Sequence, residues 1–267
     1  MSAVSLVVSD VDGTLVTPEK TLTEASIRAV HRLHEHGIGF TVVSSRPPFG
    51  LRMLIEPLAL GLPIGAFNGG AMVQPTLELI EQRLVPEAAA RRSVEVLEQF
   101  DADVWVFTAD LWLARSATGD YVPRERRTLQ AEPTVVADFA PYFARATKIV
   151  GSSRDFAKLV ACEEAMRAAL GAQASVSRSQ AYYLDVTPPS VDKGTFVTTL
   201  SQRLGIPTAA VAVLGDGEND LAMFGKAGVS IAMGNASEEV KRQATHVTNS
   251  NAEDGFAEAI ERYVLGS

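Results

Sequence analysis

Short apolar runs alternate with helix-like stretches at the start of the chain. The apolar runs predict buried strands at residues 4–9, 38–43 and 64–67. Apolar residues at helical spacing predict helices at residues 23–35 and 49–60, and Gly37 provides a stop for the first of them. Strand, helix, strand, helix, strand in this order predicts a parallel sheet with helices on its faces.

The pattern changes between residues 82 and 188. Two helices are predicted there, at residues 86–100 and 155–170. Strands are predicted at 104–108, 111–115, 147–151, 174–177 and 182–186, and Asp110 falls at a turn between the first two. This is the rhythm of an α+β domain with antiparallel hairpins.

The first pattern resumes near the end of the chain. Strands are predicted at residues 210–214 and 229–232, and helices at 193–204, 218–226, 237–244 and 254–264. The simplest architecture is a doubly wound, Rossmann-like α/β core with a parallel sheet, built from residues 1–81 and 189–267. Residues 82–188 then form an inserted α+β domain, and Pro188-Pro189 would make a stiff hinge.

Composition narrows the class of protein. The 267 residues are 46% hydrophobic and 21% charged, as in a globular protein with a sizeable core. The net charge of −8 disfavours a general nucleic-acid binder or a protein of anionic membranes, because these need an excess of Lys and Arg. An anionic substrate would have to be attracted by a local cluster or a metal ion.

Location follows from what the sequence lacks. Cys162 is the one cysteine, so no intrachain disulfide is possible, and we expect it to be a buried, inert thiol. The first residues lack the basic start of a signal peptide, and no stretch approaches the ~20 apolar residues of a membrane span. We expect a cytoplasmic protein with no membrane partner and no obligate protein partner.

Unusual polar residues follow three of the predicted strands. They are Asp10-Val11-Asp12-Gly13-Thr14, Ser44-Ser45-Arg46-Pro47 and Gly215-Asp216-Gly217-Glu218-Asn219-Asp220. Lys193 opens a predicted helix upstream of the third segment. In an open parallel sheet ligands collect beyond the carboxyl ends of the strands, so we expect these side chains to meet at one edge.

Electrostatics decides what such a meeting requires. Two unit charges 4 Å apart repel by about 4 kcal/mol at an effective dielectric of 20. Crowding of Asp10, Asp12, Asp216 and Asp220 is therefore tolerable only if a cation lies among them. All candidate ligands are hard oxygens with no His or Cys nearby, which favours Mg²⁺ over zinc.

Each segment also has a structural explanation. Asp10 to Gly13 alone could be a turn, Ser44 and Ser45 could cap a helix, and Lys193 could be solvated. The loop after Asp216 starts like an EF-hand but lacks the required glycine and the bidentate glutamate. The occurrence of all of these segments together, at strand ends and in this order, favours a common site.

These segments resemble the four signature motifs of the haloacid dehalogenase-like superfamily, and more narrowly its Cof-like subgroup with a large inserted cap. The resemblance rests on residues 10–15, Ser44, Lys193 and 215–220, with supporting matches at 68–71, 232–236 and 253–255. It covers both ends of the chain, whereas the cap matches in size and style. Ser44-Ser45 replaces the usual Thr-Gly, which retains the phosphate-binding hydroxyl but adds a side chain at Ser45.

The resemblance implies a mechanism. Asp10 attacks phosphorus and becomes a phosphoaspartate, while Asp12 acts as general acid and then general base. Mg²⁺ would be held by the Asp10 carboxylate, the Asp12 carbonyl and Asp216, with Asp220 just behind them.

The remaining residues of the resemblance would bind the phosphate. Ser44 and the Ser45 amide would bind its oxygens, Lys193 would neutralise charge, and Asn219 would orient nearby oxygens. Arg46 either steers the phosphate or braces the loop, and Asn68 either touches the substrate or makes a turn.

A lid of about a hundred residues suits small substrates, so we expect a phosphatase of small phosphorylated metabolites, sugar phosphates foremost. Residues that either select the substrate or form ordinary hairpin core are Trp105, Trp112, Arg115, Tyr182 and Tyr183. Two alternatives remain open: a phosphotransferase or phosphomutase of the same superfamily, and a non-catalytic sensor of a phosphorylated ligand.

Overall fold

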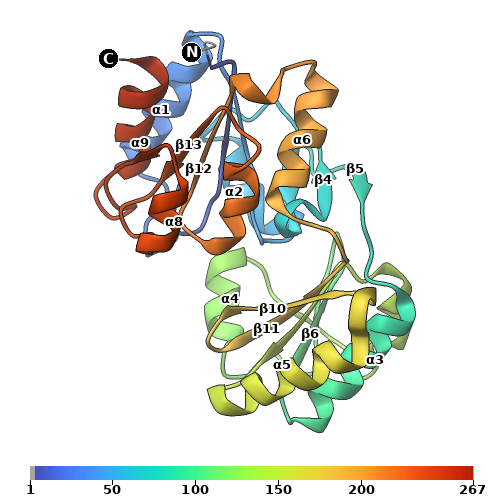
Figure 1. The fold of residues 1–267 in the computed structure, drawn as a ribbon. Coiled ribbons are helices and arrows are strands. Elements are labelled where there is room, and N and C mark those ends of the chain that lie inside the picture. Colours follow the sequence, from blue (N-terminus) through green and yellow to red (C-terminus); the bar gives the residue numbers. More distant parts are fainter. Residues whose placement is uncertain (1–3, 267) are drawn as a thin grey trace. The chain divides into compact units, whose positions relative to one another are not determined.

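The computed structural model describes residues 4–266 (Figure 1). Within them the chain forms two units: one extends to Ser45, includes Leu51–Ile80 and continues from Asp192, and the other comprises Arg46–Gly50 and Glu81–Val191. We refer to them as the core and the cap. The boundaries expected from the sequence, 1–81 with 189–267 and 82–188, remain a prediction about domains, and residues 1–3 and 267 lie outside the described range.

The core is built on a five-stranded sheet of order β14-β13-β12-β1-β2. Its strands are β1 (Leu6–Ser9), β2 (Gly39–Val42), β12 (Val211–Gly215), β13 (Val229–Ala232) and β14 (His246–Val247). All the pairings are parallel, with Ser9 in register with Val42 and Leu214. The carboxyl ends of β1 and β12 therefore meet at the same edge, as the sequence predicts.

Helices cover both faces of this sheet. They are α1 (Glu24–Glu35), α2 (Arg52–Ile55), α6 (Lys193–Leu204), α7 (Leu221–Phe224), α8 (Glu238–Gln243) and α9 (Gly255–Ala259), which continues as a π-helix over Ile260–Leu265. Leu6 and Val8 pack in one cluster with Phe196 of α6, while Phe40 of β2 packs edge-to-face on Phe256 of α9. Because neighbouring side chains of a strand point to opposite faces, the apolar run of β1 serves both layers.

Two predictions about the core are wrong in detail. The third strand, β3 (Ile64–Ala66), pairs antiparallel with β4 (Ala71–Val73) in a separate sheet that also contains β5 (Leu79–Gln82). The chain reverses at Asn68, whose backbone is left-handed, and β4 therefore runs antiparallel to β3. An isolated parallel bridge between Val43 and Gly65 connects β3 to the main sheet. The expected helices at 49–60 and 218–226 are short α-turns, each preceded by a 3₁₀ turn.

The cap holds a six-stranded sheet of order β10-β11-β9-β6-β7-β8. Its strands are β6 (Asp103–Phe107), β7 (Trp112–Ala114), β8 (Thr134–Val135), β9 (Lys148–Ser152), β10 (Ser175–Gln180) and β11 (Tyr183–Thr187). All neighbours are antiparallel except β7 and β8. The helices are α3 (Glu87–Gln99), α4 (Val122–Leu129) and α5 (Phe156–Leu170). Helix α4 and the short strand β8 were not predicted from the sequence.

The two faces of the cap sheet differ. Val104 and Val106 pack in a hydrophobic cluster with side chains of α3 and α5, which lie side by side in Figure 1. Trp105 points to the opposite face, where its ring lies 5.4 Å from that of Trp112 and 5.3 Å from that of Tyr183. Strand alternation thus separates an aliphatic core from an aromatic face.

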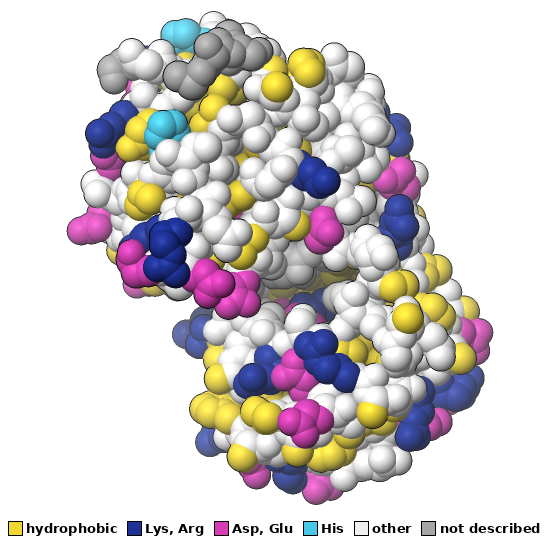
Figure 2. Space-filling view, viewed as in Figure 1, with side chains coloured by type: hydrophobic (Ala, Val, Ile, Leu, Met, Phe, Trp, Pro, Cys, Tyr) yellow, Lys and Arg dark blue, Asp and Glu magenta, His cyan; other side chains and the backbone are white. Residues whose placement is uncertain are grey.

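Charged side chains are interspersed on the surface. On the face drawn in Figure 2, Lys and Arg side chains are intermixed with Asp and Glu side chains on each unit, and this face shows no single large basic patch. In residues 4–266 no helix is both long and apolar enough to cross a membrane.

Candidate active site

Asp10 lies directly beyond the carboxyl end of β1. Its backbone N–H donates to the carbonyl of Leu214 (2.9 Å), and the Ser9 hydroxyl donates to the Asp10 carbonyl (2.6 Å). The residue is 5% exposed, so its carboxyl group is held in a largely dry environment. The sheet thus delivers a fixed, buried carboxyl group to the edge where ligands are expected.

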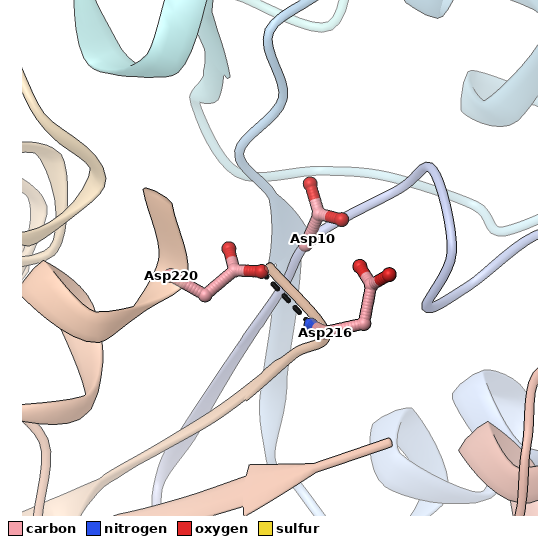
Figure 3. Close-up of side chains that lie close together, drawn as sticks. All are labelled: Asp10, Asp216 and Asp220. Carbon is pink, nitrogen blue, oxygen red and sulfur yellow. Dashed lines mark hydrogen bonds between the residues drawn. The ribbon is translucent and has the colours of Figure 1, made fainter. Parts of the chain in front are cut away.

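Two further carboxylates come from the loop after β12 (Figure 3). Asp220 Oδ2 accepts the backbone N–H groups of Asp216 and Gly217, both at 2.9 Å, so the loop folds around this side chain. Asp10, Asp216 and Asp220 each offer an oxygen, and these oxygens lie within 4.8 Å of one another. Segments about 200 residues apart in sequence therefore converge, as the strand-end pattern predicts.

Lys193 is buried in the middle of this cluster. It is the first residue of α6, whose N-cap Asp192 accepts the N–H of Thr195. Lys193 Nζ donates to Asp10 Oδ1 at 2.5 Å and to Asp220 Oδ1 at 2.7 Å, and the residue has no exposed surface. The alternative that Lys193 is a solvated helix residue is therefore wrong.

The charges of the cluster perturb one another. Burial raises the pKa of Asp10 well above its ordinary value, Lys193 opposes the rise, and Asp220 and Asp216 add to it. Burial, then Asp220, raise the pKa of Asp216 to about 6 despite Lys193. Burial alone would lower the pKa of Lys193, but Asp10 and Asp220 raise it above the ordinary value. When all three carboxylates are ionised, they and the one ammonium carry two net negative charges, which one divalent cation would balance.

The donor set fits a hard cation. Every side-chain ligand in the cluster is a carboxylate oxygen, the type that Mg²⁺ prefers. The Asp12 side chain is outside this three-carboxylate group and pairs with Lys20 instead, at 2.8 Å. Of the four carboxylates expected to crowd together, three do so, and the Asp12 carboxylate lies outside the group.

Several residues that contact the cluster were not singled out for it from the sequence. Thr14 Oγ1 donates to Asp216 Oδ1 (3.3 Å), and Asn235 Nδ2 donates to Asp216 Oδ2 (3.1 Å). Gly13 is required between them: its φ is +89°, and a Cβ there would lie 2.2 Å from Asp216 Oδ2. Lys20, which pairs with Asp12, was also not predicted, because nothing in the local sequence pattern indicates this pair.

The expected phosphate-binding residues lie at neighbouring strand ends. Ser44 follows β2, is fully buried, and its carbonyl accepts the N–H of Asn68 (2.7 Å), while Ser45 is half-buried. Asn219 Nδ2 donates to Asn68 Oδ1 at 3.2 Å, which links two loops of the same edge. The left-handed backbone of Asn68 agrees with its reading as a turn residue.

Arg46 differs from the other candidates. It is 2% exposed, and its Nη1 donates to the carbonyl of Gly50 at 3.1 Å. This hydrogen bond closes the loop of residues 46–50 on itself and favours the loop-bracing alternative over substrate steering.

Comparison with known proteins agrees with this geometry. The family model for haloacid dehalogenase-like hydrolases matches residues 7–260. The chain belongs to this family. A solved haloacid dehalogenase-like hydrolase from Bacteroides thetaiotaomicron has a TM-score of 0.90 and 29% identity, covering 97% of this chain and 99% of that one. The predicted family and the fold class, a doubly wound α/β core with an inserted α+β cap, are confirmed.

Curated proteins similar to this chain along most of its length include phosphatases. A putative phosphatase of Haemophilus influenzae is 29% identical over 256 residues, which is 96% of each chain. A 5-amino-6-(5-phospho-D-ribitylamino)uracil phosphatase of Bacillus subtilis is 28% identical over 286 residues, covering 96% of this chain and 97% of the relative. The chain is accordingly an enzyme, a phosphoric monoester hydrolase of the haloacid dehalogenase-like family.

Proposed function

We propose that this enzyme is a Mg²⁺-dependent phosphatase that hydrolyses small phosphate monoesters, foremost sugar phosphates, through a phosphoaspartate on Asp10. The observation that carries the proposal is the buried Asp10 carboxyl group, held by Lys193 at 2.5 Å beside Asp216 and Asp220. A carboxylate that attacks a phosphate dianion needs nearby positive charge. Lys193 supplies part of this charge, and a bound Mg²⁺ ion would supply the rest.

The covalent steps follow from two carboxyl groups. Asp10 forms a bond to phosphorus as the ester P–O bond breaks, and Asp12 gives its proton to the departing oxygen. Asp12 then takes a proton from a water molecule, whose oxygen attacks phosphorus and releases Asp10 with inorganic phosphate. Lys20, at 2.8 Å from Asp12, supports the position of that side chain.

Three residues would bind the metal ion, and a fourth would orient the groups around it. We assign the Asp10 carboxylate, the Asp12 carbonyl and Asp216 as ligands. Asp220, whose two oxygens already accept N–H groups, orients Lys193 and the Asp216 backbone. When bound, Mg²⁺ would offset the charge of the carboxylates and of the phosphoryl oxygens.

Residues at the neighbouring strand ends would bind the phosphoryl group. We assign the Ser44 hydroxyl, the Ser45 amide and the Asn219 side chain to this role, with Lys193 neutralising both Asp10 and the transferring group. Arg46 is assigned to bracing the loop of residues 46–50, which follows the two serines, because of its bond to the Gly50 carbonyl.

The substrate class is proposed from size and from relatives. An inserted cap of this size suits small molecules, and the Bacillus subtilis relative is named for a phosphorylated ribityl compound. Trp105, Trp112 and Tyr183 are buried against one another in the cap, which favours their reading as hairpin core over substrate selection. Arg115 is tied to the other face, where it pairs with Glu98 and lies over Phe139.

Release of inorganic phosphate from a panel of phosphorylated metabolites tests the proposal. Wild type should release phosphate with Mg²⁺, without any acceptor, and should lose this activity in excess chelator. Asp10→Asn should be inactive while retaining its fold by circular dichroism.

A matched control comes from the cap. Asp185→Asn neutralises another buried carboxylate, which pairs with Lys148 at 2.9 Å, and should still release phosphate from substrates with a simple leaving group. Equal inertness of wild type and Asp10→Asn over the whole panel would end the phosphatase proposal and favour a sensor. Transfer to an added sugar that outpaces release would favour a phosphotransferase.

A further inference from the structure

Asn235 joins three separate segments of the core. Its Nδ2 donates to the carbonyl of Gly13 (2.9 Å) and to Asp216 Oδ2 (3.1 Å). Its Oδ1 accepts the backbone N–H of Asn251 at 3.0 Å. One amide side chain thus connects the loop after β1, the loop after β12 and the loop before α9.

The backbone around Asn235 is held in place on both sides. Met233 N–H donates to the carbonyl of Gly215, the residue before Asp216, at 3.0 Å. Gly234 N–H donates to the carbonyl of Asn249, also at 3.0 Å. A Cβ on Gly234 would lie 2.8 Å from the Asn249 carbonyl carbon, so only glycine permits this approach of the two backbones. The Asn235 side chain therefore starts from a fixed point.

The hydrogen bonds also fix which way the amide faces. The N–H of Asn251 can only donate, so it selects the Asn235 oxygen and turns the NH₂ group toward Gly13 and Asp216. The Gly13 carbonyl and the ionised Asp216 carboxylate can only accept hydrogen bonds, so both need the NH₂ group as donor. A carboxylate at position 235 has the same shape as the amide but no N–H group. Its oxygen would face the Gly13 carbonyl and Asp216 Oδ2, so that three acceptors would lie together without a donor.

Asp216 is consequently held on both oxygens by neutral donors, Thr14 at Oδ1 and Asn235 at Oδ2. Neutral donors orient a carboxylate without cancelling its charge, so the group stays available to a cation. Groups that orient a metal ligand in this way typically change metal affinity by about 10- to 100-fold when they are removed.

We propose that Asn235 is a positioning residue for divalent-cation binding, which holds Asp216 against the loop of Asp10 to Gly13. The proposal rests on the metal-dependent function proposed above. Its effect is on cation affinity and not on the covalent steps.

Calorimetric titration of the full chain with MgCl₂ at pH 8 tests this role, together with the shift of melting temperature that Mg²⁺ produces. Asn235→Ala should raise the Kd for Mg²⁺ at least about tenfold. At saturating Mg²⁺ its kcat should remain within a few-fold of wild type, so that the loss appears in the Mg²⁺ requirement.

Asn235→Asp separates positioning from simple charge attraction. Added negative charge near a cation should tighten binding if only charge matters, whereas loss of the two donated hydrogen bonds should weaken it. We expect a Kd at least as high as that of the alanine variant. If the alanine variant does not fold, this isosteric variant carries the test alone.

Asn249→Ala is the matched control. Asn249 lies in the loop before α9 and contacts Gly234 through its backbone carbonyl, which the substitution keeps. Its Kd should stay within twofold of wild type. Mg²⁺ binding by Asn235→Asp as tight as wild type would overturn the inference alone, whereas absence of Mg²⁺ binding by wild type would overturn the proposed function with it.

Discussion

Replacement of Lys193 with methionine removes the one ammonium of the acidic cluster and keeps a side chain of similar length. At an effective dielectric of 20, the contacts of 2.5 Å to Asp10 and 2.7 Å to Asp220 are each worth about 6–7 kcal/mol of attraction. Dehydration of the three groups offsets much of this. We therefore expect the free energy of unfolding to fall by about 3–5 kcal/mol at pH 8 without metal, the usual cost of breaking a buried ion pair.

The loss should shrink as the pH falls. The pKa of Asp10 is already raised in the folded protein, mainly by burial, and loss of Lys193 removes a group that lowers it. Below the folded pKa the carboxyl group takes a proton, and the unpaired buried charge disappears. The penalty is therefore present at pH 8 and is progressively lost toward pH 5.

Urea unfolding followed by far-ultraviolet circular dichroism measures the effect, because urea is uncharged and does not screen the cluster. Both proteins are compared at pH 8 and pH 5 in chelator, and at pH 8 with Mg²⁺, which should restore part of the loss. Lys148→Met is the control: it breaks another largely buried pair, with Asp185, and its loss should not respond to Mg²⁺. A loss below about 1 kcal/mol at pH 8, or equal losses at both pH values, would refute this account of the cluster.

Three further outcomes are expected. Burial and Asp220 raise the pKa of Asp216 to about 6, so the Kd for Mg²⁺ by calorimetry should rise about fivefold from pH 6 to pH 5; a constant Kd would contradict this. Gly13→Ala should lower the free energy of unfolding by about 1–2 kcal/mol and weaken Mg²⁺ binding, since its Cβ would lie 2.2 Å from Asp216 at a φ of +89°. Burial raises the pKa of the Cys162 thiol to about 11, so Ellman's reagent at pH 8 should label unfolded chain far faster than native protein; rapid native labelling would show an accessible thiol.

Local sequence determined four of the five strands of the main core sheet, β1, β2, β12 and β13, and the edge at which the candidate catalytic residues lie. Apolar runs mark β1 and β12, and polar residues directly after them place Asp10 and Asp216 beyond adjacent strand ends. The helix from Lys193 to Leu204 was predicted at its observed bounds, because Asp192 caps its start and Gly205 ends it. Such features depend on periodicity and on caps, which a few neighbouring residues encode.

The tertiary structure alone decided how side chains are paired. The partner of Asp12 is Lys20, Asp216 is held by Asn235, and β3 turns back onto β4 instead of joining the parallel sheet. None of these follows from spacing, because a hydrogen bond between distant segments depends on how the loops close and on which rotamers the packing allows. Lys193 illustrates the limit: its position on a helix was clear from the chain, but its complete burial between two carboxylates exists only once the sheet has brought β1 and β12 together.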